Sequence, residues 1–342
     1  MESVAAQREL LFQTVRRVAG PLDRPYALLD FPDHSNPGDA AIWAGERTML
    51  SSLYGAPPIY AADLGSFREV VLRRRLRDGT IFLHGGGNFG DLWGRFQAFR
   101  ERVVAAFPGS RIVGLPQTVH FGTRDALDRA RAAFDGHPDL ALLVRDARSL
   151  QIVRDEFTGR SELCPDSAVA LNPLPRPAPA DRDIVRLVRT DQESLRNAAD
   201  AQPDRPPTVD WTGDERVSLL RRDRRLRRLR SQAPGLEAVL EGPSRRLGDE
   251  AARWRLERGL RLLSRGRVVV TDRLHGHILA SLLRIPHVLL DNSYGKNRRY
   301  YETWSAEDPL SRWADSAAEA DDLARGLLAS AASAGAAEGA TS

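Results

Sequence analysis

The chain has 342 residues, of which 42% are hydrophobic and 28% charged, so it is long enough for two domains of ordinary size. No apolar run approaches the roughly 18 to 20 residues that span a bilayer, and the N-terminal segment lacks the pattern of a secretory signal. The single cysteine, Cys164, excludes an internal disulfide and a cysteine-based metal cluster, and we expect a cytoplasmic protein.

The first half of the chain begins with a predicted amphipathic helix over residues 1–20. A short strand follows at 26–30, and Asp39 can cap a helix that runs from residue 40 towards residue 50. Asn36, Gly38 and Asp39 lie in the loop between them. These three residues serve either turn and capping chemistry alone or a binding site.

The next predicted strand, 80–83, runs directly into His84, three glycines at 85–87, and Asn88. Three consecutive glycines argue against a helix or strand and suit a backbone that lies close against a ligand. A turn explains one or two of them, so a site accounts better for all three. Asp91 can cap the helix that follows.

Two more predicted strands end in polar residues. Residues 111–115 lead into Pro116, Gln117 and Thr118, and residues 140–144 lead into Arg145 and Asp146, where a helix begins. The macrodipole disfavours a cation at a helix N-terminus unless an anion offsets it. Either Asp146 pairs with Arg145, or a ligand does.

Residues 172–180 contain four prolines and predict a semi-rigid linker between an N-terminal domain, 1–171, and a C-terminal domain, 181–313. The second domain opens with a strand at 183–190. Residues 217–230 predict an Arg-rich helix. It is either a solvated face or a peripheral contact with an anionic membrane, and we expect no nucleic-acid partner.

The stretch VVVTDRLHGHILAS, residues 268–281, predicts a buried strand that turns sharply into a helix capped by Asp272. Arg273, His275 and His277 then lie in the first loop or turn, where an anionic ligand would offset their charge. Alternatively, Arg273 pairs with Asp272 and the histidines pack as ordinary side chains.

The C-terminal part of the chain continues with a strand at 287–291 and a loop that holds Asn292 and Lys296, the only lysine. A final helix is predicted over 314–333, starting at about residue 317, and a disordered tail over 334–342. The strand–loop–helix pattern on both sides of the linker predicts an α/β fold of two Rossmann-like parallel-sheet domains facing a cleft.

Ligands of such sheets bind beyond the carboxyl ends of the strands, where all these polar clusters lie. The cations Arg145, Arg273, His275 and Lys296 therefore indicate an anionic small molecule. No acidic cluster of metal-ligand type accompanies them, and we expect no metal.

Six stretches make the chain resemble the polysaccharide pyruvyl transferases, in particular the bacterial exopolysaccharide enzymes. They are NPGDAAIWAGE, HGGGNFGDLW, GLPQT, LLVRDARS, TDRLHGHI and DNSYGKNRRYYETW. The resemblance implies a fold like that of the B-type glycosyltransferases. It also implies phosphoenolpyruvate as co-substrate, no cofactor, and a sugar diol, free or lipid-linked, that becomes a pyruvate ketal with release of phosphate.

Through its RLH and RD motifs, the resemblance implies that Arg273, Leu274, His275 and Arg145 line the donor pocket. We place Gly276, Asn292 and Lys296 on the same donor side, in the C-terminal domain. The N-terminal domain supplies the acceptor side, for which the candidates are Asn36, Gly38, Asp39, His84, Gly85, Gly86, Gly87, Asn88, Asp91 and Gln117.

The chemistry requires a proton for C3 of the enol, and His275 is the predicted general acid, assisted by Arg273 and Arg145, with His277 or Lys296 as its replacements. Asp39, His84 or Asp91 could take the hydroxyl protons. Two other functions fit the same pattern: a B-type glycosyltransferase that uses a nucleotide sugar, and a non-catalytic protein that binds an anionic glycan. An enzyme of lipid-linked glycans would lie at the inner face of the membrane.

Overall fold

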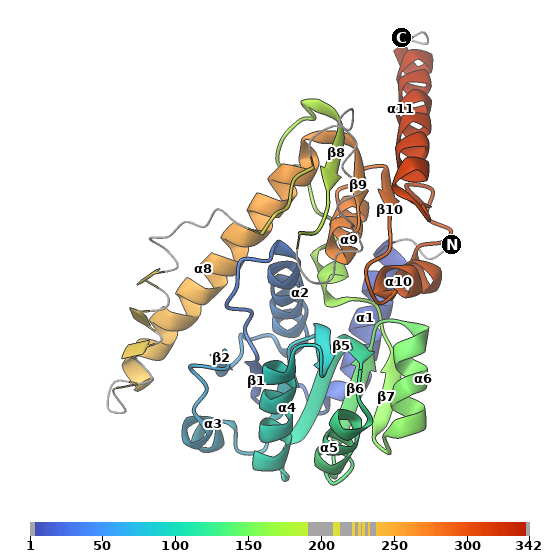
Figure 1. Ribbon diagram of the computed structural model, residues 1–342. Coiled ribbons are helices and arrows are strands. Elements are labelled where there is room, and N and C mark those ends of the chain that lie inside the picture. The colour runs from blue at the N-terminus through green and yellow to red at the C-terminus, as the bar shows by residue number, and fades with distance from the viewer. Residues whose placement is uncertain are drawn as a thin grey trace.

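The computed structural model describes residues 4–190, 208–212, 221–222, 225–226, 228–229, 232 and 237–339. Two open sheets of parallel strands organise it (Figure 1). Sheet A has seven strands and lies in the N-terminal half; sheet B has four and lies in the C-terminal half. The prediction of two Rossmann-like parallel-sheet domains is confirmed.

Sheet A has the strand order β2-β1-β3-β5-β6-β7, and β4 pairs with β5. Every pair of neighbouring strands in it is connected through at least one helix, which is the kind of connection that parallel neighbours require. The elements are α1 (Val4–Ala19), β1 (Tyr26–Leu29), α2 (Pro37–Tyr54), β2 (Tyr60–Ala62), α3 (Glu69–Leu76), β3 (Thr80–Leu83), β4 (Gly86–Gly90), α4 (Gly94–Ala106), β5 (Arg111–His120), α5 (Arg124–Phe134), β6 (Leu140–Val144), α6 (Ala147–Glu156), β7 (Arg160–Leu163) and the 3-10 helix η1 (Ser167–Leu171).

Sheet B has the strand order β11-β10-β9-β8. Its strand β9 shows how both faces are covered: Val268 and Val270 pack in a cluster under the C-terminal helix, whereas Val269 joins the large central core. The elements are β8 (Arg182–Leu187), α8 (Glu237–Ser264), β9 (Gly266–Thr271), α9 (Leu274–Leu282), β10 (His287–Leu289), α10 (Lys296–Trp304), β11 (Ser311–Trp313) and α11 (Ala317–Gly339).

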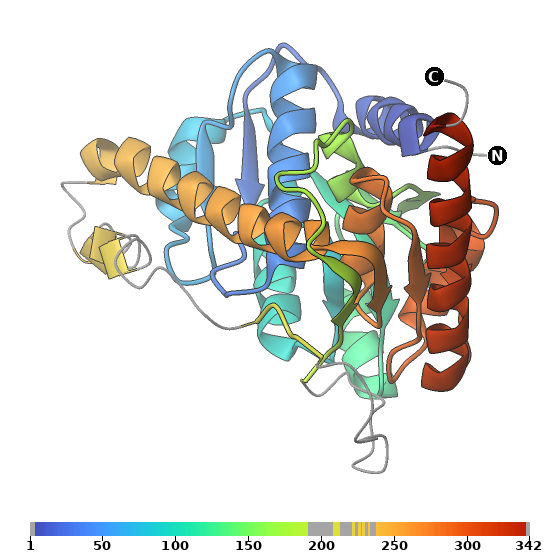
Figure 2. The ribbon, with the colours of Figure 1, turned by 90° about the horizontal axis from the view of Figure 1, so that it is seen from above.

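The two sheets share one core. A single hydrophobic cluster runs from α1 and α2 through Leu28 of sheet A to Val269 of sheet B. Helix α2 packs against α8, α9 and η1, and α8 extends from sheet B across to the sheet A half (Figures 1 and 2). Asp249 of α8 accepts hydrogen bonds from Trp43 Nε1 at 3.2 Å and Arg47 Nη2 at 2.8 Å. These contacts tie the two halves together, and the boundary at 172–180 stays a prediction.

Four strands were not predicted from the sequence, namely β2, β4, β7 and β11. The most instructive is β4, because we expected the glycines to exclude a strand. They form one that pairs with β5 irregularly, with a register shift between Gly86 and Phe89. Gly90 has a φ of +127°, and a Cβ there would lie 1.7 Å from the His120 carbonyl oxygen. The glycines permit this close approach of two backbones.

Three predicted caps were wrong and one was confirmed. Asn36, and not Asp39, caps α2, by accepting from Gly38 N. Neither Asp272 nor Asp91 caps the helix that follows it. Asp146 caps α6, as expected, by accepting from Ser149 N at 2.8 Å.

Two further expectations concern the C-terminal helix and the Arg-rich segment at 217–230. Helix α11 continues to Gly339, beyond the end predicted at residue 333, so residues 334–339 are helical and not a disordered tail. The Arg-rich helix predicted over 217–230 lies largely outside the described residues; positions 221–222, 225–226 and 228–229 are helical. No helix in the described ranges is long and apolar enough to cross a membrane.

Candidate active site

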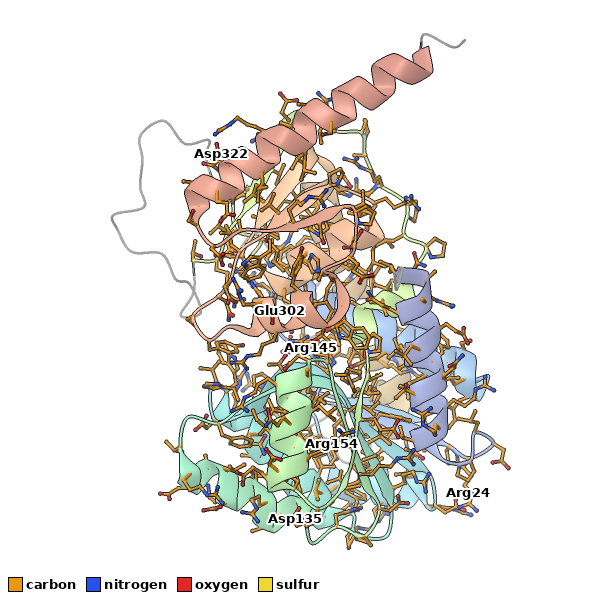
Figure 3. The ribbon with its side chains drawn as sticks, turned by 90° about the vertical axis from the view of Figure 1, so that its right-hand side faces the viewer. Arg24, Asp135, Arg145, Arg154, Glu302 and Asp322 are labelled. Atoms are coloured by element: carbon orange, nitrogen blue, oxygen red, sulfur yellow. The ribbon has the colours of Figure 1, made fainter. Side chains whose placement is uncertain are left out.

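A cavity of about 310 Å³ opens where the carboxyl ends of the two sheets face each other. Residues that follow β1, β3 and β6 of sheet A line one side, and residues that follow β8 and β9 of sheet B line the other. In Figure 3, Arg145 lies at this junction, above the helix that its strand leads into. Ligands of parallel sheets bind at this position, beyond the carboxyl ends of the strands.

Most of the predicted site residues meet here. The cavity is lined by Asn36, Asp39, His84, Gly87, Asn88, Arg145, Arg273, Leu274, His275 and Lys296. The predicted residues outside its lining are Gly38, Gly85, Gly86, Asp91, Gln117, Gly276 and Asn292.

Two cations from opposite domains converge on Gly87. A Cβ built on this glycine would lie 3.3 Å from Arg145 Nη2 and 3.8 Å from both Lys296 Nζ and Tyr294 Oη. Because Gly87 has no side chain, the space between the guanidinium and the ammonium stays open to a ligand. Two converging cations suit a phosphate or carboxylate.

Arg145 is 1% exposed, and its partner is Asp166 instead of Asp146. Nη1 lies 2.5 Å from Asp166 Oδ2, and Nε donates to Thr118 Oγ1 at 3.0 Å. Burial favours a lower pKa for the Arg145 guanidinium, but the Asp166 carboxylate raises it above its ordinary value. The side chain is thus charged and fixed, with Nη2 turned towards Gly87.

Asp166 also faces His275. Its Oδ2 lies 3.4 Å from His275 Nε2, and its Oδ1 accepts from Ala168 N at 2.8 Å. Burial would raise the pKa of Asp166, but His275, Arg145 and the Ala168 amide together lower it well below its usual range. Asp166 was not predicted from the sequence, because β7, the strand before it, reads RSEL and has no apolar run.

Gly38 packs closely against the His275 imidazole from the acceptor side. A Cβ on Gly38 would lie 2.7 Å from His275 Nδ1, closer than real Cβ contacts. We expect Gly38→Ala to displace the imidazole and to lower turnover roughly tenfold or more, because small misplacements of reacting groups are costly. Gly94→Ala is the matched control, since no atom lies within 4 Å of a Cβ there. Steady-state rates measure both; a Gly38→Ala rate equal to that of the control would contradict the packing argument.

Arg273 pairs with Asp210 and not with Asp272. Its Nη2 lies 2.7 Å from an Asp210 carboxylate oxygen, and its guanidinium lies 5.8 Å from the Trp211 ring centroid. Asp272 instead accepts from Arg189 N at 2.8 Å. Burial raises the pKa of Asp210, but the hydrogen bond and charge of Arg273 bring it down to about 2.

The three candidate bases on the acceptor side differ in their positions and their hydrogen-bond partners. Asp39 Oδ2 accepts from Asn36 Nδ2 at 2.7 Å and lies 3.5 Å from His34 Nε2. Burial would raise the pKa of Asp39, but the neighbouring histidines, His34 first, and Lys296 lower it below its ordinary value. Asp39 is therefore ionised and lines the cavity.

His84 and Asp91 are less suited to accept a proton. His84 Nδ1 lies 2.7 Å from Glu46 Oε2; burial lowers the pKa of His84, but the Glu46 carboxylate raises it above the ordinary value. Asp91 lies outside the cavity lining and accepts hydrogen bonds from Gly122 N and Thr123 N.

His277 does not face the cavity. Its Nδ1 lies 2.7 Å from His287 Nε2 and its Nε2 lies 2.8 Å from Ser305 Oγ, within the protein interior. Burial, and then His287, lower its pKa well below the ordinary value. The prediction of His277 as a replacement acid is wrong on position, and Lys296 remains as the alternative.

Several cavity residues were not predicted from the sequence. They are Asp30, Pro32, His34, Ser35, Trp93, Arg95, Phe96, Arg189, Trp211 and Thr212. The first four lie in the loop before α2, so the position of Asn36 could have pointed to them. Asp30 has a φ of 73°, and burial raises its pKa to about 6 although Arg100 lies 3.2 Å away. Within the described ranges, no group of three or more His, Cys, Asp or Glu residues could hold a metal ion.

The fold and the site define an α/β protein with two Rossmann-like domains and a cationic cavity between their parallel sheets. Residues 36–294 match the family model described as polysaccharide pyruvyl transferase, and the chain belongs to this family. It is similar to pyruvyl transferase 1 of Schizosaccharomyces pombe, with 31% identity over 315 residues that cover 88% of this chain and 75% of that protein.

A bacterial relative is equally similar. The putative pyruvyl transferase EpsO of Bacillus subtilis (strain 168) is 32% identical over 302 residues, which cover 86% of this chain and 89% of EpsO. Among solved structures, a functionally uncharacterised protein of Klebsiella pneumoniae subsp. pneumoniae NTUH-K2044 superposes with a TM-score of 0.58 at 17% identity, covering 89% of this chain and 97% of that one. This likeness supports the fold. The resemblance to B-type glycosyltransferases stays a prediction.

Proposed function

We propose that the protein transfers the enolpyruvyl group of phosphoenolpyruvate to a sugar diol and closes a pyruvate ketal, with release of phosphate. The observation that carries this proposal is the convergence of Arg145 Nη2 and Lys296 Nζ on the open space at Gly87. Phosphoenolpyruvate has a phosphate at one end and a carboxylate at the other, so it needs cations at two places. Arg273 lines the same cavity and supplies the second place.

The reaction balances with one acid and one base. The first sugar hydroxyl forms a bond to C2 and gives its proton to the base, while C3 takes a proton from the acid. The bond from C2 to the phosphate oxygen then breaks, and phosphate leaves with the electron pair. The second hydroxyl attacks C2 and closes the ring, and its proton passes to the departing phosphate.

His275 and Asp39 are the residues that we assign to these two proton transfers. His275 lines the cavity, and its Nε2 lies 3.4 Å from Asp166 Oδ2, so the carboxylate orients the imidazole that donates the proton. Asp39 is ionised and lies on the acceptor side, whereas the pKa of His84 is raised and disfavours the unprotonated form that a base requires. The cations at the place that holds the phosphate stabilise the charge that accumulates on it as it leaves.

The acceptor in this proposal is a saccharide, free or lipid-linked, and the reaction needs no cofactor. The relatives named pyruvyl transferase support the transferred group. A lipid-linked acceptor would place the enzyme in the cytoplasm at the inner face of the membrane. The exposed Arg221, Arg222 and Arg225 would then face anionic lipid headgroups.

Thermal stability tests the donor. Phosphoenolpyruvate at about 100 times its Kd should stabilise the wild type by roughly 2.7 kcal/mol, and nucleotide sugars should not. Arg273→Ala should abolish the shift, whereas Arg267→Ala should keep it, because Arg267 pairs with Asp183 on the surface. Incubation with phosphoenolpyruvate and candidate glycans should add the mass of one pyruvyl group to the product.

Two outcomes would redirect the assignment. An unchanged shift in Arg273→Ala would place the donor elsewhere. A shift caused by a nucleotide sugar instead of phosphoenolpyruvate would favour a glycosyltransferase.

A further inference from the structure

Trp93 occupies a position where helices prefer a small polar side chain. It is the N-cap of α4 and makes no capping hydrogen bond. Ser, Thr, Asp and Asn are favoured at an N-cap because their side chains accept from the free backbone N–H groups. Asp91, two residues earlier, does not cap the helix in its place, since its carboxylate accepts hydrogen bonds from the backbone N–H groups of Gly122 and Thr123. The needs of the helix therefore do not explain an indole at this position.

Trp93 also differs from the other five tryptophans, whose rings or N–H groups are engaged within the protein. Three donate from Nε1, namely Trp43 to Asp249, Trp304 to the Arg145 carbonyl oxygen and Trp313 to Asp315. Two lie under a guanidinium, Trp254 under Arg258 and Trp211 under Arg273. The Trp93 side chain makes neither a hydrogen bond nor a ring contact with the described part of the chain. It is half-buried and lines the cavity, so its ring and its N–H are available to a ligand.

Asn88, which lines the same side of the cavity, presents a hydrogen-bond donor. Its Oδ1 accepts from Arg100 Nη2 at 2.5 Å, and its backbone carbonyl accepts from Arg100 Nη1 at 2.8 Å. Arg100 is buried and can only donate, so these bonds fix the amide with Nδ2 as the atom left to donate to a ligand. Asp39, in the same cavity, supplies an acceptor through its ionised carboxylate.

An aromatic ring, an amide donor and a carboxylate acceptor in one cavity fit a pyranose. The C–H face of the sugar ring is apolar and packs against an indole, whereas its hydroxyls need both donors and acceptors. A small anion such as phosphoenolpyruvate uses none of the aromatic surface. The cavity thus has a cationic part at Gly87 and an aromatic part at Trp93.

We propose that Trp93 is the platform on which the pyranose ring of the acceptor stacks, with Asn88 donating to one hydroxyl and Asp39 accepting from another. The inference rests on the proposed function and names the residue that binds its second substrate. It also specifies the ligand class: a pyranoside with an uncovered C–H face and at least two free hydroxyls.

Direct binding of sugars tests this subsite without turnover. Methyl glucopyranosides, galactopyranosides and mannopyranosides are titrated into the full chain without phosphoenolpyruvate, and binding is followed by saturation-transfer NMR. We expect at least one glycoside to bind the wild type and Trp93→Ala to weaken it at least tenfold, which is about 1.4 kcal/mol. Trp93→Phe should recover part of the affinity. Trp313→Ala is the matched control, because Trp313 is also half-buried but lies outside this cavity.

The outcomes separate the subsite from the proposed reaction. Equal glycoside binding by Trp93→Ala and the wild type would overturn the subsite, and so would a wild type that binds none of the glycosides. Loss of phosphoenolpyruvate-dependent stabilisation in both Trp93→Ala and Trp93→Phe would also overturn it, since Trp93 would then serve the whole cavity. Trp93-dependent sugar binding without any pyruvylated product would uphold the subsite and refute the proposed function.

Discussion

His275→Gln is expected to lower turnover by roughly a hundredfold or more, while phosphoenolpyruvate still stabilises the variant to within about 1 kcal/mol of the wild-type effect. Glutamine keeps hydrogen-bonding capacity at similar size but cannot give up a proton near neutral pH. Binding and chemistry should therefore separate. Single-turnover rates and thermal shifts with phosphoenolpyruvate measure the two effects independently.

His137→Gln controls for the loss of a histidine as such, since His137 bonds to the Phe107 carbonyl oxygen away from the cavity. A fall in binding, turnover and ligand-free stability together would assign His275 to packing against Gly38 and Asp166. Normal binding with near wild-type turnover would instead transfer the acid role to Lys296, which lines the same cavity.

The sequence was informative wherever the signal is local. The strand β9 and the helix α9 are encoded by three valines followed by a helix-compatible apolar run, and both formed as predicted. The rule that ligands bind beyond the carboxyl ends of parallel strands then brought Arg145, Arg273, His275 and Lys296 into one cavity. None of these inferences required a long-range contact to be known.

The sequence could not predict which aspartate pairs with each of the two buried arginines. Arg145 and Arg273 each have an aspartate as their next-door neighbour, and proximity in sequence favoured those pairs. In the fold, Arg145 pairs with Asp166 and Arg273 with Asp210, which are 21 and 63 positions away. The neighbouring aspartates instead accept hydrogen bonds from backbone N–H groups. Asp146 caps a helix, and Asp272 accepts from Arg189 N. A carboxylate beside a helix start has two competing uses, and only the packed structure decides between them.

The prediction for the glycine-rich stretch was wrong for a different reason. In Gly86–Gly90, Phe89 is the one residue of a type that favours a strand, so propensity argued against one. The strand forms because its glycines allow the backbone to approach β5, where a Cβ would collide with the His120 carbonyl. A tertiary requirement thus overrode the local preference.

Removing Asp166 should have the largest effect on stability. Asp166 is fully buried between Arg145 and His275, and Asp166→Ala would leave the Arg145 charge buried without its counterion. Loss of one partner from a buried pair costs about 3 to 5 kcal/mol of unfolding free energy. Asp183→Ala, which removes the exposed partner of Arg267, should cost roughly 1 kcal/mol or less. Urea unfolding at neutral pH measures both, and equal losses would contradict the burial argument.

Asp166→Asn isolates the charge, because the amide keeps the shape and one acceptor oxygen. The pKa of Asp166 is lower in the folded protein than in the unfolded chain, since His275 and Arg145 hold its charge against burial. The carboxylate therefore contributes stability that is complete above its unfolded pKa of about 3.9 and is lost as the pH falls through the folded value. The stability difference between the wild type and Asp166→Asn should be largest near neutral pH and should shrink below about pH 4. A difference that stays constant from pH 7 to pH 3 would contradict this account. The Asp166 carboxyl group would then titrate in neither state over this range, or equally in both, and its pKa would not be lowered by folding.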